Sequence, residues 1–315
     1  MVQPIETNAT LLEKQPYGDR ICAFRVQPDA QWAGLQQGRI PEFQPGQHVV
    51  LGLNGEPGQV LRRPYTITTP PDQKQWLEFF IRYDDRPELT EADSMTHRLW
   101  RLEPGGRLHL GPRITGRFTL EATIGPQDPR RCLLVAGGTG ITPFASMLRT
   151  RTHRAMGPGR FALMHGVSYP DELGFREEFE ALFTPEPERY MPTISRPAET
   201  RDWTGHTGRV ETFFDGDQLP RLAQRLGLAM GQLDPEHLVV FICGRFGTLR
   251  HVMMQLMPLG FVPSDRATRK ALGLTDEPAS MFVEQFDHRP ILDADNEDDM
   301  RWVRRHTSFG GAASD

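Results

Sequence analysis

One stretch in the middle of the chain constrains its fold most strongly. Residues 132–136, Cys-Leu-Leu-Val-Ala, are a short apolar run typical of a strand buried on both faces, and Gly137, Gly138 and Gly140 follow at once. Pro143 then fits the first turn of a helix, where its missing N–H costs nothing. Such a turn lets the backbone approach a phosphate closely, and the amides at the helix start favour an anion. The stretch therefore predicts a nucleotide-binding unit, although similar turns occur in α/β proteins that bind none.

The composition narrows the class of protein. At 315 residues the chain can form two domains of ordinary size, and a net charge of -5 without a basic block argues against nucleic acid as the main partner. No apolar run approaches the roughly 20 residues needed to span a bilayer, and no signal-peptide pattern opens the sequence. We therefore expect a cytoplasmic protein with no membrane partner.

The cysteines and histidines show no metal or disulfide pattern. Cys22, Cys132 and Cys243 are scattered and odd in number, which excludes a disulfide framework and a four-cysteine iron–sulfur cluster. No pair of histidines has the short helical spacing of a metal site. We predict no metal.

The predicted elements change in kind near residue 125. Short strands punctuated by Gly, Pro and Asp precede it, which is typical of an antiparallel barrel or sandwich, with one helix over residues 94–102. Apolar strands alternating with amphipathic helices follow it, as in a parallel sheet wrapped by helices. The strands predicted before the change are Thr10–Lys14, Ile21–Val26, His48–Leu53, Pro64–Thr69, Trp76–Tyr83 and Arg107–Leu110. Those predicted after it are Cys132–Ala136, Phe161–Val167, Tyr190–Ile194, Leu238–Cys243 and Met281–Val283, with helices over Pro143–Thr150, Phe175–Phe183, Leu219–Leu226 and Thr248–Leu259.

The chain is thus predicted to form two domains and a tail. Residues 1–125 form an antiparallel β-barrel domain, residues 126–288 an α/β domain with a parallel, Rossmann-like sheet, and residues 289–315 a C-terminal extension. Within the extension, Asn296 is the predicted cap of one short helix. The extension either stays loose or folds back through Trp302 and covers part of the FAD or a partner surface.

A second motif lies in the first domain. Arg63 and Tyr65 are two residues apart in a predicted strand, so they share one face and offer a stacking surface beside a guanidinium that can bind a diphosphate. Thr66 points to the other face, where its hydroxyl can bond a ring edge. An edge tyrosine beside a surface arginine is the alternative interpretation.

Taken together, the motifs resemble the bacterial branch of the ferredoxin-NADP reductase family. The resemblance spans residues 11–287, and the motifs occur in the family's order. They are Arg63–Thr66, Phe79–Tyr83, Thr96–Leu99, Gly116–Leu120, Gly137–Pro143, His165–Leu173, Arg196 with Arg209, Cys243–Gly244 and Phe282–Phe286.

The resemblance implies a first domain that binds FAD. Tyr65 would then pack on the isoalloxazine, Arg63 would neutralise the pyrophosphate, and Thr66 would lie near the flavin N5. Residues 94–96 at a helix start would offer amides to the pyrophosphate. The cofactor-binding residues implied in this domain are Arg63, Pro64, Tyr65, Thr66, Ile81, Arg82, Tyr83, Ser94, Met95 and Thr96.

It also implies a second domain that binds NADP(H). The turn at Gly138, Thr139 and Gly140 would face the nicotinamide nucleotide. Arg196 and Arg209 match the positions that hold the 2'-phosphate, and paired arginines suit that charge, whereas a ribose diol favours a carboxylate. Two solvated loop arginines are the alternative, and Ser168 stands where the family often has an arginine. NADPH is therefore the preferred donor.

Two further segments would complete the reaction site. The resemblance implies that Cys243 lies by the nicotinamide C4, and that Glu284 and Phe286 on the last strand approach the same place. Thr66, Cys243 and Glu284 would tune geometry and proton supply as the catalytic residues, although Cys243 is also an ordinary buried residue type.

The expected activity is FAD-mediated transfer between NADPH and a one-electron carrier, ferredoxin or flavodoxin, by a monomer. One alternative is an NAD(P)H-dependent reductase that serves an oxygenase or reduces free flavin. Another is a flavin-binding electron-transfer subunit without catalysis of its own. The direction of electron flow stays open.

Overall fold

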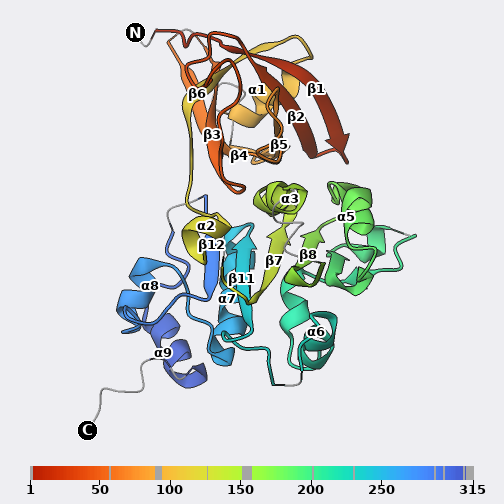
Figure 1. Cartoon of the computed structure of the whole chain (residues 1–315), viewed down its shortest axis with the longest axis vertical. Helices are drawn as coiled ribbons and strands as arrows, with labels where there is room; N and C mark the ends of the chain where they lie inside the picture. Colours follow the sequence, from red (N-terminus) through yellow and green to blue (C-terminus); the bar gives the residue numbers. More distant parts are fainter. Residues whose placement is uncertain are drawn as a thin grey trace. The chain divides into compact units, whose positions relative to one another are not determined.

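The computed structural model describes residues 3–56, 58–88, 94–125, 127–150, 158–200, 202–229, 231–286, 289–293, 295–307 and 309. The chain divides into two compact units, Met1–Pro126 with Thr142–Ala155, and Gln127–Ile141 with Met156–Asp315. Figure 1 traces both. The helix after the glycine-rich turn thus belongs with the first unit, whereas the turn belongs with the second. The two-domain fold class is confirmed, and the domain limits assigned from the sequence stay predictions.

The first unit is built on a six-stranded antiparallel sheet. Its strand order is β4-β3-β6-β1-β2-β5, and all the described pairings are antiparallel. Just beyond β4, the backbone N–H of Thr68 donates to the carbonyl of Glu78 on β5 at 2.9 Å, which links the two edges. The strands are β1 (Ala9–Tyr17), β2 (Ile21–Pro28), β3 (His48–Asn54), β4 (Val60–Thr66), β5 (Leu77–Arg82) and β6 (Arg107–Thr115).

Short capped helices and one core complete this unit. Helix α1 (Met95–Arg101) begins at Ser94, whose side chain accepts from the backbone N–H of His97, and α2 (Leu120–Thr123) is capped in the same way by Thr119. Inward-facing residues of the strands form the core, with Phe24 and Phe79 fully buried. Helix α3 (Thr142–Arg149) belongs to the unit and is buried over its first seven residues.

The second unit is a six-stranded parallel sheet with helices around it. Its order is β10-β9-β8-β7-β11-β12. The strands are β7 (Arg131–Gly137), β8 (Phe161–Val167), β9 (Tyr190–Ile194), β10 (His206–Thr207), β11 (Leu238–Cys243) and β12 (Met281–Glu284). The α-helices are α5 (Arg176–Leu182), α6 (Leu219–Arg225), α7 (Phe246–Leu256), α8 (Arg266–Ala271) and α9 (Glu297–His306). The 3-10 helices are η1 (Gly138–Ile141), η2 (Pro158–Arg160), η3 (Pro170–Glu172), η4 (Pro187–Arg189), η5 (Pro197–Glu199), η6 (Val210–Phe214) and η7 (Met257–Leu259).

Most predicted elements are found within one or two residues of their predicted ends. The strand predicted over Pro64–Thr69 instead runs from Val60 to Thr66, because the N–H of Thr68 bonds across to β5. Strand β10 and helices α2 and α8 were not predicted; β10 has two residues, α2 four and α8 six, too few for a clear period.

The C-terminal extension is part of the second unit. Ile291, Leu292 and Val303 are 3%, 2% and 1% exposed and belong to its main core cluster, against which Trp302 packs. Asn296 caps α9 as predicted, accepting from the N–H groups of Asp298 and Asp299. The described part of the extension therefore folds back onto the core of the α/β unit.

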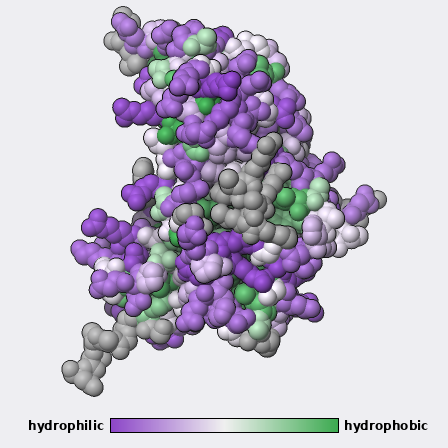
Figure 2. Space-filling view, in the orientation of Figure 1, coloured by the Kyte–Doolittle hydropathy of each residue, from purple (hydrophilic) through white to green (hydrophobic). Residues whose placement is uncertain are grey.

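Few large hydrophobic side chains are exposed on the described part of the chain. Leu12 and Phe286 are the large hydrophobic side chains that are exposed in the described part of the chain. On the face in Figure 2, hydrophilic residues predominate and hydrophobic ones form small separate patches. None of the described helices is long and apolar enough to cross a membrane.

The three cysteines are buried, and they form no disulfide with one another.

Candidate functional site

Strand β4 carries the predicted flavin-stacking residues. Tyr65 is half-buried and packs against the core of the first unit, and burial raises the pKa of its phenol, so it stays protonated. Arg63, on the same face, is exposed and donates to the carbonyl of Arg62 at 2.8 Å. Thr66, on the other face, is 4% exposed. An aromatic ring and an exposed guanidinium therefore share one face, as the sequence predicts.

The end of β5 and the start of α1 lie together. The ring of Tyr83 stacks on His97 of α1, with centroids 4.6 Å apart, and the Thr96 hydroxyl accepts from the N–H of Asp84 at 3.0 Å. Helix α1 also packs against β4. The three segments predicted to bind FAD, on β4, at the end of β5 and at the start of α1, thus lie in the same unit.

Several of these side chains serve the fold. Ile81 and Met95 are 3% and 4% exposed and belong to the core, so their backbones are what a cofactor could reach. Ser94 caps α1 with its hydroxyl. Arg82 is half-buried, and Pro64 is exposed on β4.

In the second unit, the turns after β7 and β11 touch each other. The two strands are neighbours, with Cys243 beside Ala136. A Cβ on Gly140 would lie 2.0 Å from the carbonyl oxygen of Cys243, so only glycine fits there. Gly138 has a φ of 58°, and a Cβ at this position would meet nothing within 4 Å, so it adds a left-handed bend beside open space. Thr139 lies between them in η1.

Cys243 and Glu284 form a pair at the carboxyl edge of this sheet. They face each other in register on β11 and β12, and the Cys243 Sγ donates to Glu284 Oε2 at 3.8 Å. Burial, and then the nearby carboxylate, raise the pKa of the Cys243 thiol well above its usual range. The thiol is therefore neutral at physiological pH. Phe286, two residues beyond, is 59% exposed.

The two predicted phosphate-binding arginines follow adjacent strands. Thr207 of β10 pairs with Ile194 of β9, and Arg209 and Arg196 each come two residues later, so both lie at the same sheet edge. The Arg209 side chain is 71% exposed and 3.9 Å from Glu211.

Arg196 is held by a residue that the sequence analysis did not single out. Its Nη1 donates to the Tyr169 hydroxyl at 2.7 Å, and its guanidinium lies 5.4 Å from the Tyr169 ring centroid. The Tyr169 hydroxyl donates to Glu199 at 2.6 Å. Tyr169 follows β8 by two residues, and an aromatic residue at the carboxyl end of a parallel strand was the available signal.

One cavity of the first unit is lined by residues of β3, β6 and the C-terminal half of α1. It measures about 300 Å³ and is lined in part by Arg98, Arg101 and Arg107 of the first unit. Arg107 pairs with Asp29, and Arg98 donates to the carbonyl of Asn54 at 3.4 Å, so both have partners. We assign no ligand to this cavity. The described residues include no group of three His, Cys, Asp or Glu side chains that could hold a metal.

Comparisons with known proteins place oxidoreductases among the relatives of this chain. A family model described as "Oxidoreductase NAD-binding domain" matches residues 134–253. Ferredoxin–NADP reductase B of Sorangium cellulosum is 32% identical over 239 residues, which cover 74% of this chain and 88% of that protein. The xylene/toluene monooxygenase electron transfer component of Pseudomonas putida is 28% identical over 221 residues, covering 67% of this chain and 54% of that protein.

A solved structure shares the fold. The ferredoxin NADP+ reductase of Neisseria gonorrhoeae, determined with bound FAD and NADP, aligns with a TM-score of 0.66 at 20% identity, covering 88% of this chain and 97% of that one.

Proposed function

Since this chain belongs to the ferredoxin-NADP reductase family of oxidoreductases, we propose that it transfers electrons from NADPH through bound FAD to ferredoxin or flavodoxin. The observation that carries the proposal is the carboxyl edge of the parallel sheet, where Gly140 touches the backbone of Cys243 and the Cys243 thiol meets Glu284. Parallel sheets bind ligands at this edge.

The residues of the first unit suit FAD. Tyr65 offers a half-buried ring for stacking, and the exposed guanidinium of Arg63 on the same face can bind a diphosphate. Thr66 and the backbone of residues 81–83 and 94–96 supply further contacts. Bound FAD would accept two electrons from a nicotinamide and release them singly, and the protein would align the rings and exclude water.

The second unit suits a nicotinamide dinucleotide. The backbone of the turn at Gly138, Thr139 and Gly140 binds its diphosphate, since Gly138 has open space beside it and Gly140 lets the turn lie directly against the Cys243 carbonyl. Cys243 and Glu284 lie at the reacting end. Because the Cys243 thiol keeps its proton, it can sit against a positively charged or neutral nicotinamide without adding a charge there. Glu284 accepts a hydrogen bond from the Cys243 thiol and so orients the sulfur atom.

The arginines favour NADPH over NADH. Arg209 is exposed at the edge where Arg196 also lies, and a 2'-phosphate would bind between two such cations. Tyr169 stacks on Arg196 and limits its motion, which lowers the entropy cost of binding. Glu199 is the opposing feature, since a carboxylate near Tyr169 suits a ribose diol.

A second candidate function is that of an NAD(P)H-dependent reductase that supplies electrons to an oxygenase. It is favoured by the similarity to the electron transfer component of a monooxygenase, which covers 67% of this chain. In that case the final acceptor is a separate iron–sulfur protein of the oxygenase rather than a general carrier.

Assays with separate acceptors test the proposal. With NADPH, the protein should reduce cytochrome c rapidly only when ferredoxin or flavodoxin is added. Equal rates with free flavin alone would contradict a carrier-specific reductase. Faster turnover with NADH than with NADPH would contradict the proposed donor.

A further inference from the structure

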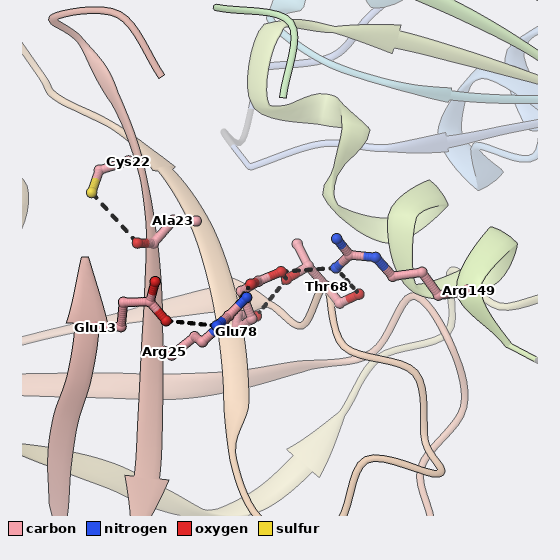
Figure 3. Close-up of polar contacts among 7 residues, drawn as sticks. All are labelled: Glu13, Cys22, Ala23, Arg25, Thr68, Glu78 and Arg149. Carbon is pink, nitrogen blue, oxygen red and sulfur yellow. Dashed lines mark hydrogen bonds and ion pairs between the residues drawn. The ribbon is translucent and has the colours of Figure 1, made fainter. Parts of the chain in front are cut away.

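A buried carboxylate in the first unit joins a barrel strand to helix α3. Glu78 of β5 is 2% exposed. Figure 3 shows it between two arginines: Arg25 of β2 approaches from one side and Arg149 of α3 from the other. The Arg25 Nε lies 3.2 Å from Glu78 Oε2, and the Arg149 Nη1 lies 2.8 Å from Oε1. We call Glu78, Arg149 and Thr68 the Glu78 network.

Thr68 completes the network. Its hydroxyl lies 2.9 Å from Glu78 Oε1, and its backbone carbonyl accepts from Arg149 Nη1 at 3.1 Å. One residue on, the carbonyl of Thr69 accepts from the Ser146 hydroxyl at 2.7 Å. Helix α3 is therefore bonded at two places to the segment that directly follows β4.

Both ends of this connection are close in sequence to the proposed cofactor residues. Thr68 comes two residues after Thr66 and three after Tyr65. Helix α3 starts at Thr142, directly after η1 with Gly138 and Gly140. A helix is stiff over eight residues, so fixing its last turn at Arg149 also fixes where its first turn points.

We propose that the Glu78 network is a positioning device for electron transfer. By holding α3 against the segment after β4, Arg149 fixes the helix that directly follows the glycine-rich turn in the chain. The proposal rests on the proposed function. Misplacement of reacting groups by about 1 Å can lower a rate on the order of 100-fold, which makes such a restraint consequential.

The two arginines provide a matched pair of variants. In Arg149→Met, Glu78 keeps Arg25, so no buried carboxylate is left without a cation, and the loss falls on the attachment of α3. In Arg25→Met, Glu78 keeps Arg149 and Thr68, and the lost contacts, with Glu13 and the Trp76 ring, lie within the barrel. Both variants remove one arginine from the same carboxylate.

The experiment compares both variants with the wild-type holoprotein. For each we would measure FAD content, the dissociation constant of NADP+ from its difference spectrum, the rate of flavin bleaching by NADPH in anaerobic stopped flow, and amide hydrogen exchange of the peptide over residues 138–150. We expect Arg149→Met to slow bleaching at least tenfold and to speed exchange in that peptide, with FAD content and NADP+ affinity within twofold. Arg25→Met should leave bleaching and that exchange within twofold of wild type. Arg149→Lys, which keeps a cation but has a single nitrogen in place of the guanidinium fork, should fall between.

Two outcomes would overturn the inference. Equal bleaching rates and equal exchange in Arg149→Met and Arg25→Met would show that the network acts only on stability. If Arg149→Met does not fold, Ser146→Ala, which removes one hydroxyl bond to Thr69, must show the same changes to a smaller extent; unchanged values refute the inference. A wild-type protein that NADPH does not bleach would instead contradict the proposed function.

Discussion

At the scale of single residues, the carboxyl edge of the parallel sheet has a neutral thiol at one place and two arginine side chains at another. Cys243 is kept neutral by burial and by Glu284, whereas the guanidinium groups of Arg196 and Arg209 follow strands further along the same sheet. A neutral end suits a nicotinamide ring and a cationic end suits a phosphate. The proposed binding of NADPH would use both, with the nicotinamide at the neutral end and the 2'-phosphate at the cationic end.

Arg209, which is exposed, should determine whether the protein prefers NADPH or NADH. Because a bond between charged groups contributes about 1.5–3 kcal/mol, Arg209→Ala should weaken NADPH binding by that amount and leave NADH binding unchanged. Titration of each nucleotide followed by flavin absorbance measures this. Arg304→Ala, which removes an exposed arginine on α9, is the control and should change neither affinity. Equal weakening of both nucleotides by Arg209→Ala would argue against a phosphate contact.

A buried histidine should make stability depend on pH. His165 on β8 is fully buried, no described residue hydrogen-bonds either ring nitrogen, and burial lowers its pKa from 6.5 to about 3. The unfolded chain therefore binds a proton that the folded chain refuses, so stability is lost as pH falls from 6.5 toward 3. The slope from this group is about 1.4 kcal/mol per pH unit.

Removal of the ring tests this dependence. In His165→Leu, the free energy of unfolding in urea should fall less between pH 6.5 and 4.5 than it does in the wild type. An unchanged slope would show that His165 is not the group responsible.

At the scale of elements, an ion pair between α7 and α9 helps to hold the C-terminal helix. Arg250 of α7 pairs with Asp299 of α9 and also donates to the carbonyl of Ile291 at 2.8 Å. The hydrogen bond from Arg250 lowers the pKa of Asp299, so its contribution is present above the carboxyl's ordinary value of 3.8 and is lost as pH falls through the lowered one.

Two neighbouring aspartates on α9 allow a matched test. Asp299→Asn should reduce the free energy of unfolding at pH 7 by about 1.5–3 kcal/mol, since a charged hydrogen bond is lost. Asp298→Asn should change it by no more than about 0.5 kcal/mol, because the Asp298 side chain is 85% exposed and its pair with Arg301, at 3.1 Å, lies in solvent. Chemical denaturation of both variants gives the comparison, and equal effects would mean that the Arg250 pair does not hold the helix.

The sequence predicted strands that are continuous apolar runs and a helix that has a clear cap. Phe161–Val167 and Leu238–Cys243 are apolar almost throughout and have the ends that were predicted. The cap of α9 at Asn296 was also predicted. What was missed depends on contacts far apart in the chain, such as Tyr169 with Arg196 and Glu78 with Arg149, which are 27 and 71 residues apart. A pattern within a short stretch of sequence cannot show contacts between residues so far apart in the chain.

At the scale of the whole molecule, the chain crosses between its two units beyond the boundary predicted from the sequence. The first unit takes up Thr142–Ala155 after the strand and glycine-rich turn of the second. The change from strands to alternating strands and helices near residue 125 could not show this, because α3 is an ordinary helix of the second pattern by its sequence. Its docking follows from Ser146 and Arg149, whose partners lie more than 70 residues earlier.

An anaerobic titration of the purified protein with NADPH, followed at the flavin absorbance band, tests the central claim most directly. We expect a yellow protein with about one FAD per chain, which about one equivalent of NADPH bleaches fully. A colourless protein that binds no FAD, or bound flavin that NADPH leaves oxidised, would contradict it.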